Sequence, residues 1–579
     1  MPSDDTTTLS HVRVSRRALL LGLSVLLASC RASILGRDKA TPTVRPTEPG
    51  SAGAGTESPG TGGGEVGTVL EAPPPATVAD PSGEQTLTMI GSPDGPATLD
   101  PALVRDTESA FVTRQIFRGL VRLDEQLQPV PDLARRIEIS PDGLTYTFFL
   151  WEDITFANGR RITAEDVRYS LERATDPALA GGHGETLPAG TYLADIAGAA
   201  DRLAGRADSL RGVEVLDQGT VRITLEHPTT NFLLKLAATP GYVVDRENAR
   251  NDGNWWKKPN GSGPFNLAEW REQERIVLEA HPGYTPNPPT LERVVILIGT
   301  EALQPVAMYE QGEVDVADVG LFEIDRLQAP NSPLREELHV QPLFAVSYVL
   351  FNPNVPPLDN PDLRRALLQG FDRHKIATVT YDGHVTPVDG ILPPGLLGRD
   401  WPAEVPAYDP EAARALLDRA VGSERPTVSI YTTGAQAPVA MKQVYQRDLG
   451  LPVEVLQLDF TDYINELGTR EMPATSLTWV ADFPDPDTFL RALFYSTSPD
   501  NPIGYRNPEV DRLLDEARGE TDPERRAALF QQVQQTIIDD AVVVPLYAEA
   551  SLTLIKPYVH GMTLTPLGIL GLETVWMTL

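Results

Sequence analysis

The sequence predicts a multi-lobed α/β protein, on three observations. The chain has 579 residues, too many for one ordinary hydrophobic core. From about residue 84 to the C-terminus, segments with the alternation of strands are mixed with segments that have the periodicity of amphipathic helices, which favours α/β architecture. Hydrophobic residues make up 41% of the chain and charged residues 22%, as in soluble globular proteins.

The first thirty residues have the pattern of an export signal. Arg16-Arg17 precede an apolar run of eleven residues, 18–28, which is followed by Ser29-Cys30. As a helix this run would rise about 16 Å, too short for a hydrocarbon core of about 30 Å. We therefore expect a cleaved signal peptide over residues 1–29, exported by the Sec or the twin-arginine route.

Cys30 is the only cysteine of the chain, so no disulfide framework is possible. The stretch Leu27-Ala28-Ser29-Cys30 resembles a bacterial lipobox, which implies that Cys30 becomes the lipidated first residue. Residues 30–82 are rich in Thr, Pro, Gly and Ser and poor in large apolar side chains. Such a segment cannot bury enough surface to offset the entropy of ordering, so we expect a disordered tether.

Four segments of the body read as strands. They are Gln85–Ile90, Leu144–Leu150, Val221–Leu225 and Arg293–Gly299. The second and third alternate apolar and polar residues, as half-buried strands do. The fourth is a continuous β-branched run, which predicts a central strand buried on both faces.

A recurring device marks the starts of helices: an Asp or Asn cap is followed by proline at the first helical position. It occurs at Asn360-Pro361, Asp409-Pro410, Asn507-Pro508 and Asp522-Pro523. Apolar residues follow at roughly i, i+3, i+4 and i+7, so one face of each helix should pack. Thr163 to Asp166 open a further helix with a capping-box pattern.

Charge and motifs exclude several classes of function. A net charge of −31 repels phosphate backbones, so we expect no nucleic-acid partner. This charge serves solubility, or else it marks an acidic cleft for cationic ligands. The eight histidines form no H-x-x-x-H pair, and the chain has no second cysteine, G-x-S-x-G elbow or phosphate loop. We expect no catalytic residues, metal or cofactor. Residue types alone leave open one alternative, a carboxylate pair of the glycosidase kind.

Five ordered segments of the body resemble one family. They are Leu99–Ala102 with Gln115–Leu120; Phe148–Trp151 through Phe156–Gly159 to Thr163–Val167; Gly261–Phe265; Phe351-Asn352 with Arg364–Ala366 and Asp372-Arg373; and Trp479 through Asp482–Pro486 to Tyr505–Pro508. In this order they resemble family 5 of the extracytoplasmic solute-binding proteins, the oligopeptide, dipeptide and nickel receptors of ABC importers. The Asn158-Gly159 turn departs from the residues that relatives commonly show there.

The resemblance implies a bilobed, periplasmic-binding-protein-like fold with an extra inserted domain and a ligand cleft between the lobes. Lobe I would be discontinuous and the inserted domain small. The implied bounds are 83–122, 240–345 and 548–579 for lobe I, 123–239 for the inserted domain, and 346–547 for lobe II.

The resemblance also implies ligand-binding residues. In peptide-binding relatives an aspartate in the segment that matches Trp479 to Asp482 meets the α-amino group of the ligand, and the stretch that matches Ser109-Ala110-Phe111 lines the cleft. A carboxylate in a dry cleft is costly alone and favourable beside a cation. Trp479 walls the cleft or packs beneath it, and Asp485 and Asp487 read as loop residues.

The expected role is capture of a peptide, or of an oligosaccharide or metal chelate, by a lipid-anchored monomer outside the cytoplasmic membrane. The partners would be the permease and ATPase subunits of an importer. A sensor or chaperone without transport is the competing class.

Overall fold

The computed structural model describes residues 67–74, 81–180, 187–250, 253–285, 288–299 and 304–579. The predicted signal peptide and Cys30 lie outside these ranges. None of the helices in the described ranges has the length and apolar character that a membrane crossing needs.

A five-stranded antiparallel sheet packs with short helices around an apolar core, and this part of the chain is called the small domain below. Its strand order is β1-β5-β6-β8-β7. Tyr146, Phe148 and Leu150 alternate into its core with Val221 and Ile223, which confirms the two predicted half-buried strands. The elements are β1 (Thr68–Glu71), β5 (Ala134–Ile139), β6 (Thr145–Leu150), β7 (Val213–Asp217), β8 (Thr220–Thr224), α2 (Ala164–Ala174), α3 (Ala189–Tyr192), α4 (Ala199–Leu203) and α5 (Phe232–Leu236).

Strand β1 corrects the predicted tether of residues 30–82. Thr68–Glu71 pair with the edge strand β5, from Thr68 opposite Ile139 to Glu71 opposite Arg136. Leu70 packs against the core of the small domain. The Thr-Val-Leu stretch has good strand propensity, and the free edge of β5 offers unpaired backbone groups that a strand can satisfy.

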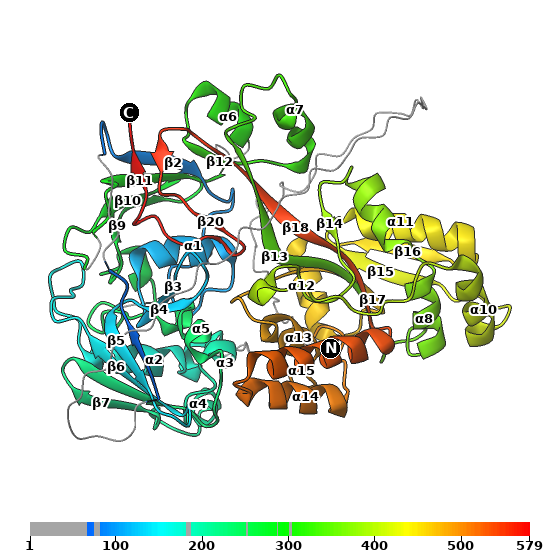
Figure 1. Ribbon diagram of the computed structural model, residues 1–579, viewed down its shortest axis with the longest axis horizontal. Helices are drawn as coiled ribbons and strands as arrows, with labels where there is room; N and C mark the ends of the chain where they lie inside the picture. Colours follow the sequence, from blue (N-terminus) through cyan, green and yellow to red (C-terminus); the bar gives the residue numbers. More distant parts are fainter. Residues whose placement is uncertain (1–66, 75–80, 181–186, 251–252, 286–287, 300–303) are drawn as a thin grey trace, which may run out of the picture. The chain divides into compact units, whose positions relative to one another are not determined.

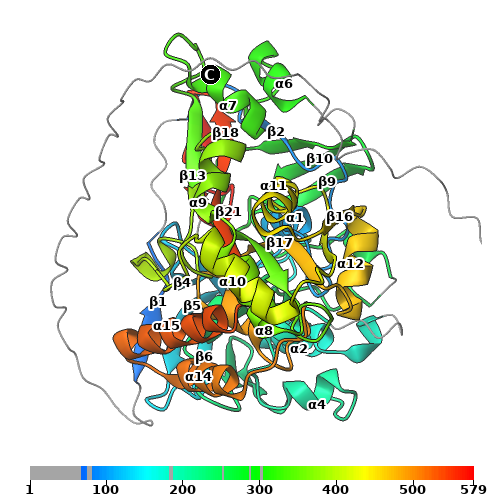
Figure 2. The same cartoon turned by 90° about the vertical axis from the view of Figure 1, so that its right-hand side faces the viewer.

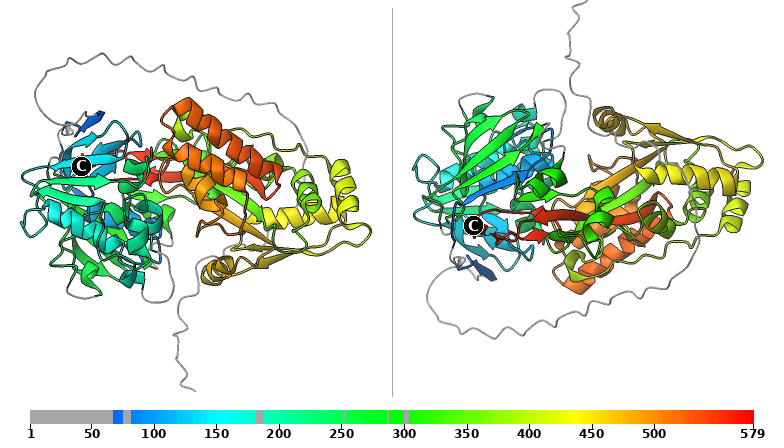
Figure 3. Two further views of the ribbon diagram at one scale, coloured as in Figure 1. Left: turned by 90° about the horizontal axis from the view of Figure 1, so that it is seen from below. Right: turned by 90° about the horizontal axis from the view of Figure 1, so that it is seen from above.

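A second, larger sheet runs through both lobes. Its order is β16-β15-β17-β13-β18-β12-β2-β11-β10-β9. The long antiparallel strands β13 (Leu338–Phe351) and β18 (Val543–Ile555) pair with β12 at one end and β17 at the other. Figure 1 shows these two strands crossing from the blue and green elements to the yellow and orange ones, and both views in Figure 3 show the same crossing. The two strands therefore join lobe I to lobe II.

Lobe I consists of the strands beyond β18 with their helices. They are β2 (Thr86–Ile90), β9 (Phe265–Arg271), β10 (Arg275–Ala280), β11 (Arg293–Leu297), β12 (Val316–Asp318), α1 (Thr107–Ile116), α6 (Pro305–Gln311) and α7 (Ile324–Gln328). Val294 and Ile296 of β11 are buried, whereas Val295 and Leu297 are only half-buried. The prediction that this strand is buried on both faces is therefore wrong, because its second face is covered only in part, with Leu297 against a smaller apolar cluster.

Lobe II carries most of the helices. Figure 2 shows α14 and α15 side by side there. The elements are β15 (Val428–Thr432), β16 (Val453–Gln457), β17 (Ala474–Val480), α8 (Pro361–Gln369), α9 (Arg373–Lys375), α10 (Pro410–Val421), α11 (Gln436–Val444), α12 (Phe460–Thr469), α13 (Asp487–Phe494), α14 (Pro508–Gly519) and α15 (Pro523–Asp539).

The predicted helix starts are confirmed residue by residue. Asn360, Asp409, Asn507 and Asp522 each cap a helix, accept a hydrogen bond from a backbone N–H of its first turn, and precede proline at its first position. These caps satisfy amide groups that a helix leaves unpaired at its N-terminus. The backbone N–H of Thr163 donates to the Asp166 carboxylate at 3.0 Å, as the capping-box pattern predicted.

Candidate functional site

One cavity among the described residues has a volume of about 750 Å³. This lies within the usual range for sites that bind small molecules. Its lining comes from both lobes and the small domain: the end of β2, the first turns of α1, Tyr192 of α3, the segment after α5, the end of β17, part of β18, and the stretch from Leu564 to Glu573.

Asp482 stands at this cavity, just after β17. Its side chain is exposed, and the space to which it is exposed is the cavity. Thr488 fixes it from the next helix: the Asp482 backbone N–H donates to the Thr488 hydroxyl at 3.1 Å, and that hydroxyl donates to the Asp482 carboxylate at 3.3 Å. The carboxylate is therefore held in place while it stays open to a ligand.

The surroundings of Asp482 disfavour its negative charge. Enclosure by protein atoms raises the pKa of Asp482 to about 6; hydrogen bonds from Tyr192 and Thr488 oppose this rise, and the nearby Asp500 carboxylate adds to it. A carboxylate in such a place gains from a cation that supplies both charge and N–H donors. The arrangement suits an ammonium group.

Of the residues predicted beside Asp482, Ala110 and Phe111 line the cavity, whereas Ser109 and Trp479 do not. Ser109 is fully buried, and its hydroxyl accepts from the backbone N–H of Ala97 at 2.9 Å. It lies on the buried face of α1 with Val112 and Ile116. Its side chain therefore contributes to the packing of the helix and does not contact the cavity. The Trp479 indole N–H donates to the Thr488 carbonyl at 2.8 Å, so Trp479 packs beneath Asp482.

The sequence did not single out Tyr192. Its ring meets Phe483 edge-on at 6.4 Å between centroids, and its proximity lowers the pKa of the Asp482 carboxyl group. Tyr192 ends a helix of four residues, too short to show periodicity, so no signal in the sequence could have found it.

Charged residues of both signs line the cavity. Arg114 of α1 reaches it, and its Nε donates to the Tyr242 hydroxyl at 3.2 Å. Glu108 lies in the first turn of the same helix, and burial raises the pKa of its carboxyl group. Deeper in the wall, Arg118 pairs with Glu573 at 2.7 Å. The lining is therefore mixed in charge and does not form a purely acidic cleft.

Asp485 and Asp487, read from the sequence as loop residues, are buried. Arg526 holds the Asp485 carboxylate with two bonds of 2.6 and 2.9 Å, and Arg491 bonds to Asp487 at 3.0 Å. The loop reading is confirmed for Asp485, which lies between β17 and α13, and is wrong for Asp487, which is the first residue of α13. Nearby arginines neutralise both carboxylates, which makes their burial tolerable.

Within the described ranges, no three His, Cys, Asp or Glu side chains lie close enough together to hold a metal ion. The polar groups that line the cavity can recognise a ligand by charge and hydrogen bonds.

Comparison with known proteins provides independent evidence on the family of this chain. The profile of the bacterial extracellular solute-binding proteins, family 5, middle region, matches residues 128–501. The oligopeptide-binding protein OppA of Bacillus subtilis is 28% identical, over 81% of this chain and 88% of the relative. Heme-binding protein A of Haemophilus influenzae is also 28% identical, over 82% of this chain and 89% of the relative.

A solved structure has the same fold. It is the ABC transporter-associated periplasmic binding protein DppA from Helicobacter pylori in complex with the peptide STSA. It is 25% identical to this chain, with a TM-score of 0.72, and the match covers 85% of this chain and 98% of that structure.

Proposed function

The chain belongs to the family 5 bacterial extracellular solute-binding proteins, and from this membership we propose that it captures a peptide or similar small solute. Capture takes place outside the cytoplasmic membrane, and a permease with its ATPase receives the solute for import. The chain binds and performs no catalysis. The single observation that carries the peptide assignment is Asp482, a fixed carboxylate that opens into a cavity of about 750 Å³.

Two properties of the cavity support a peptide over a neutral solute. Its lining offers both a carboxylate and a guanidinium, Asp482 and Arg114, which suits a ligand that carries both charges. Apolar groups such as Phe111 and Ile569 lie between polar ones, as ligand sites usually require. Relatives named for oligopeptides and for heme are equally similar to this chain, so an oligosaccharide or metal-chelate receptor, or a sensor without transport, is the alternative.

The proposal includes a lipid anchor on Cys30 and a monomeric protein. The lone cysteine directly after a short apolar run supports the anchor. We propose the domain bounds suggested by the sequence, 123–239 for the small domain and 346–547 for lobe II. Residues 68–71 are added to the small domain because β1 joins its sheet.

A thermal-shift screen of the purified protein tests the ligand class. The panel contains short peptides with free N-termini, neutral oligosaccharides, metal chelates and heme. A ligand at one hundred times its Kd adds about 2.7 kcal/mol to the free energy of unfolding. We expect peptides to raise the melting temperature and the other classes to leave it unchanged. If only an oligosaccharide raised the melting temperature, the protein would be assigned as an oligosaccharide receptor instead of a peptide receptor.

A further inference from the structure

A second cavity, with a volume of about 280 Å³, lies beside the first. The residues that line both cavities are Arg122, Leu123, Leu570, Gly571 and Glu573. The rest of its lining is Ala72–Pro74 after β1, Asp124–Gln126 in the turn between β3 (Val121–Leu123) and β4 (Pro129–Pro131), Pro131 and Asp132, Tyr284, and Thr563, Thr565 and Thr574. The second cavity is therefore bounded by segments that lie far apart in the sequence.

Carboxylates outnumber cations in this lining. Asp124, Glu125, Asp132 and Glu573 stand against one guanidinium group, that of Arg122. An excess of negative charge in a partly enclosed space raises the local concentration of cations. The charge of the second cavity therefore favours a cationic ligand.

Asp132 lines the second cavity with an unpaired oxygen. Only 3% of its side chain is exposed. Its Oδ1 accepts from the Tyr284 hydroxyl at 3.0 Å, whereas its Oδ2 accepts no hydrogen bond from any described residue. The Arg118 Nε lies 3.7 Å from Oδ2, beyond hydrogen-bonding distance. Glu573 Oε2 is also buried and accepts no hydrogen bond within the described ranges. Because buried acceptors are costly when unpaired, these two oxygens favour a donor in the cavity.

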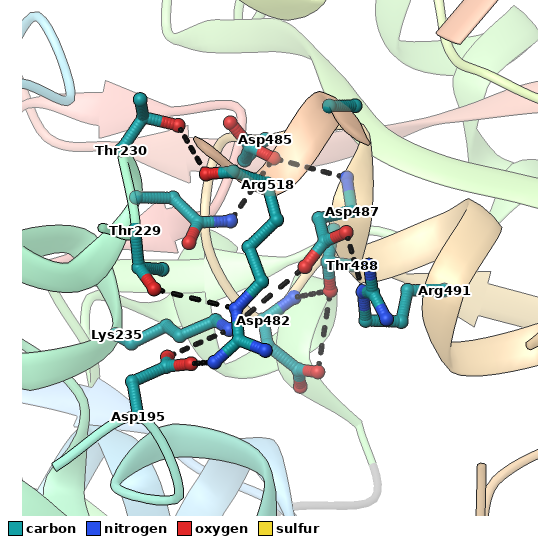
Figure 4. Close-up of polar contacts among 12 residues, drawn as sticks. Asp195, Thr229, Thr230, Lys235, Asp482, Asp485, Asp487, Thr488, Arg491 and Arg518 are labelled. Carbon is teal, nitrogen blue, oxygen red and sulfur yellow. Dashed lines mark hydrogen bonds and ion pairs between the residues drawn. The ribbon is translucent and has the colours of Figure 1, made fainter. Parts of the chain in front are cut away.

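Buried carboxylates elsewhere in the chain accept hydrogen bonds at both oxygens. Asp195 accepts from Arg518 at one oxygen and from Lys235 at the other, at 3.1 Å (Figure 4). Both oxygens of Asp485 accept from Arg526, at 2.6 and 2.9 Å. At these positions the chain itself supplies the cation, whereas the second cavity has two carboxylate oxygens without a donor.

An ammonium group combines a positive charge with three N–H donors. Burial raises the pKa of the Asp132 carboxyl group, and a cation beside it would favour the ionised form. Glu125, by contrast, is exposed, so the carboxylates stand at a buried and at an exposed side of the cavity. Apolar groups such as Pro73 and Leu570 complete the lining and suit a hydrocarbon chain between two charges. The volume is at the lower end for ligand sites, so the ligand is small.

We propose that the second cavity is a binding site for a short aliphatic diamine. One ammonium group bonds to Asp132 and Glu573, and the other lies toward Asp124 and Glu125. This site is separate from the one at Asp482, and the proposal does not depend on the proposed function.

Calorimetric titration with putrescine tests the site in the Asp482→Asn variant, which lacks the carboxylate that could attract the same cation to the first cavity. Salt at about 0.15 M screens charges farther apart than about 8 Å, which suppresses weak attraction of any cation by the net charge of −31. We expect one putrescine per chain and no binding of butanediol, which has the same chain length and no charge. Absence of putrescine binding would overturn the proposal.

Asp132→Asn, added to this variant, removes the charge and keeps an oxygen that can accept from Tyr284. We expect the affinity for putrescine to fall at least about tenfold, the loss typical of a hydrogen bond to a charged group. Glu214→Gln is the matched control, because Glu214 is an exposed carboxylate on β7, at the edge of the small domain's sheet opposite β1. It should leave the affinity unchanged.

Thr563→Phe locates the ligand without a change of charge. Thr563 is half-buried and lines the second cavity, so a phenyl ring there should fill the space and abolish putrescine binding. Circular dichroism confirms that each variant is folded, and Thr563→Phe decides the matter if Asp132→Asn is not. Undiminished putrescine binding by the folded variants would overturn the site.

Discussion

The pKa of the Asp482 carboxyl group is influenced by side chains from separate parts of the chain. Thr488 lies on the next helix, Asp500 follows that helix, and Tyr192 comes from the small domain. The sequence could indicate Asp482, because it lies in a segment that resembles the family. It could not indicate Tyr192, since no pattern surrounds it. Ser109 was misplaced for a simpler reason: helical spacing puts it with Val112 on the buried face of α1.

The raised pKa of Asp482, about 6, predicts how peptide affinity depends on pH. An ammonium ligand needs the ionised carboxylate, so below pH 6 each bound peptide must first displace a proton. Affinity should then fall by up to about tenfold per pH unit. Above about pH 8 the peptide's own amino group loses its proton. Calorimetric titration with a free peptide from pH 5 to 9 should therefore show an optimum between 6 and 8.

Asp482→Asn is the control for this profile. The variant should bind the peptide weakly, and its affinity should not fall further below pH 6, because no carboxyl group titrates at position 482.

The stability of the protein without ligand should also depend on pH. In the wild-type protein, a raised pKa means that the folded state holds the proton on Asp482 more tightly than the unfolded state. The contribution of Asp482 to stability is therefore most favourable at acid pH and is lost as pH rises through 6. The variant should melt higher than wild type at pH 7.5, and the difference should shrink toward pH 4. A flat affinity profile across pH 6 would remove Asp482 from ligand recognition.

At the scale of elements, local signals predicted helices better than strands. The Asn-Pro and Asp-Pro starts were confirmed because capping is a local matter between neighbouring residues. Strand β1 was missed because its partner β5 lies more than sixty residues later, and four residues carry little pattern of their own. The burial of the second face of β11 depends on which elements pack against it. The apolar sequence of the strand does not show which elements these are.

The N-terminal segment carries its own prediction. Cys30→Ser removes the only thiol that a lipid could occupy. We expect this variant to leave the membrane fraction or to accumulate as unprocessed precursor, because the apolar run 18–28 is too short to span. Fractionation and immunoblotting measure this, and Ser33→Ala, a nearby serine substitution that spares the thiol, is the matched control. Processed Cys30→Ser protein that still sediments with membranes would contradict the anchor.

At the scale of the whole molecule, the bilobed α/β fold could be predicted from several segments that resemble the family. Each segment alone is weak evidence, and their order along the chain makes the prediction specific. The contacts between the small domain and lobe II did not follow. Asp195 and Arg518 are more than three hundred residues apart, and Asp485 looks like an ordinary loop aspartate until Arg526 and Asn231 are placed beside it. Long-range ion pairs of this kind require the fold before they can be recognised.

The central claim is that the cavity recognises a peptide through its α-ammonium group at Asp482. Calorimetric titration of one short peptide and its N-acetylated form at pH 7 tests it most directly. Acetylation removes the cation and leaves the carboxylate unpaired, which should cost about 2–5 kcal/mol. This corresponds to a loss of affinity of about thirtyfold to several thousandfold. Asp482→Asn should bind both forms equally weakly, whereas equal, tight binding of both forms to the wild-type protein would contradict the claim.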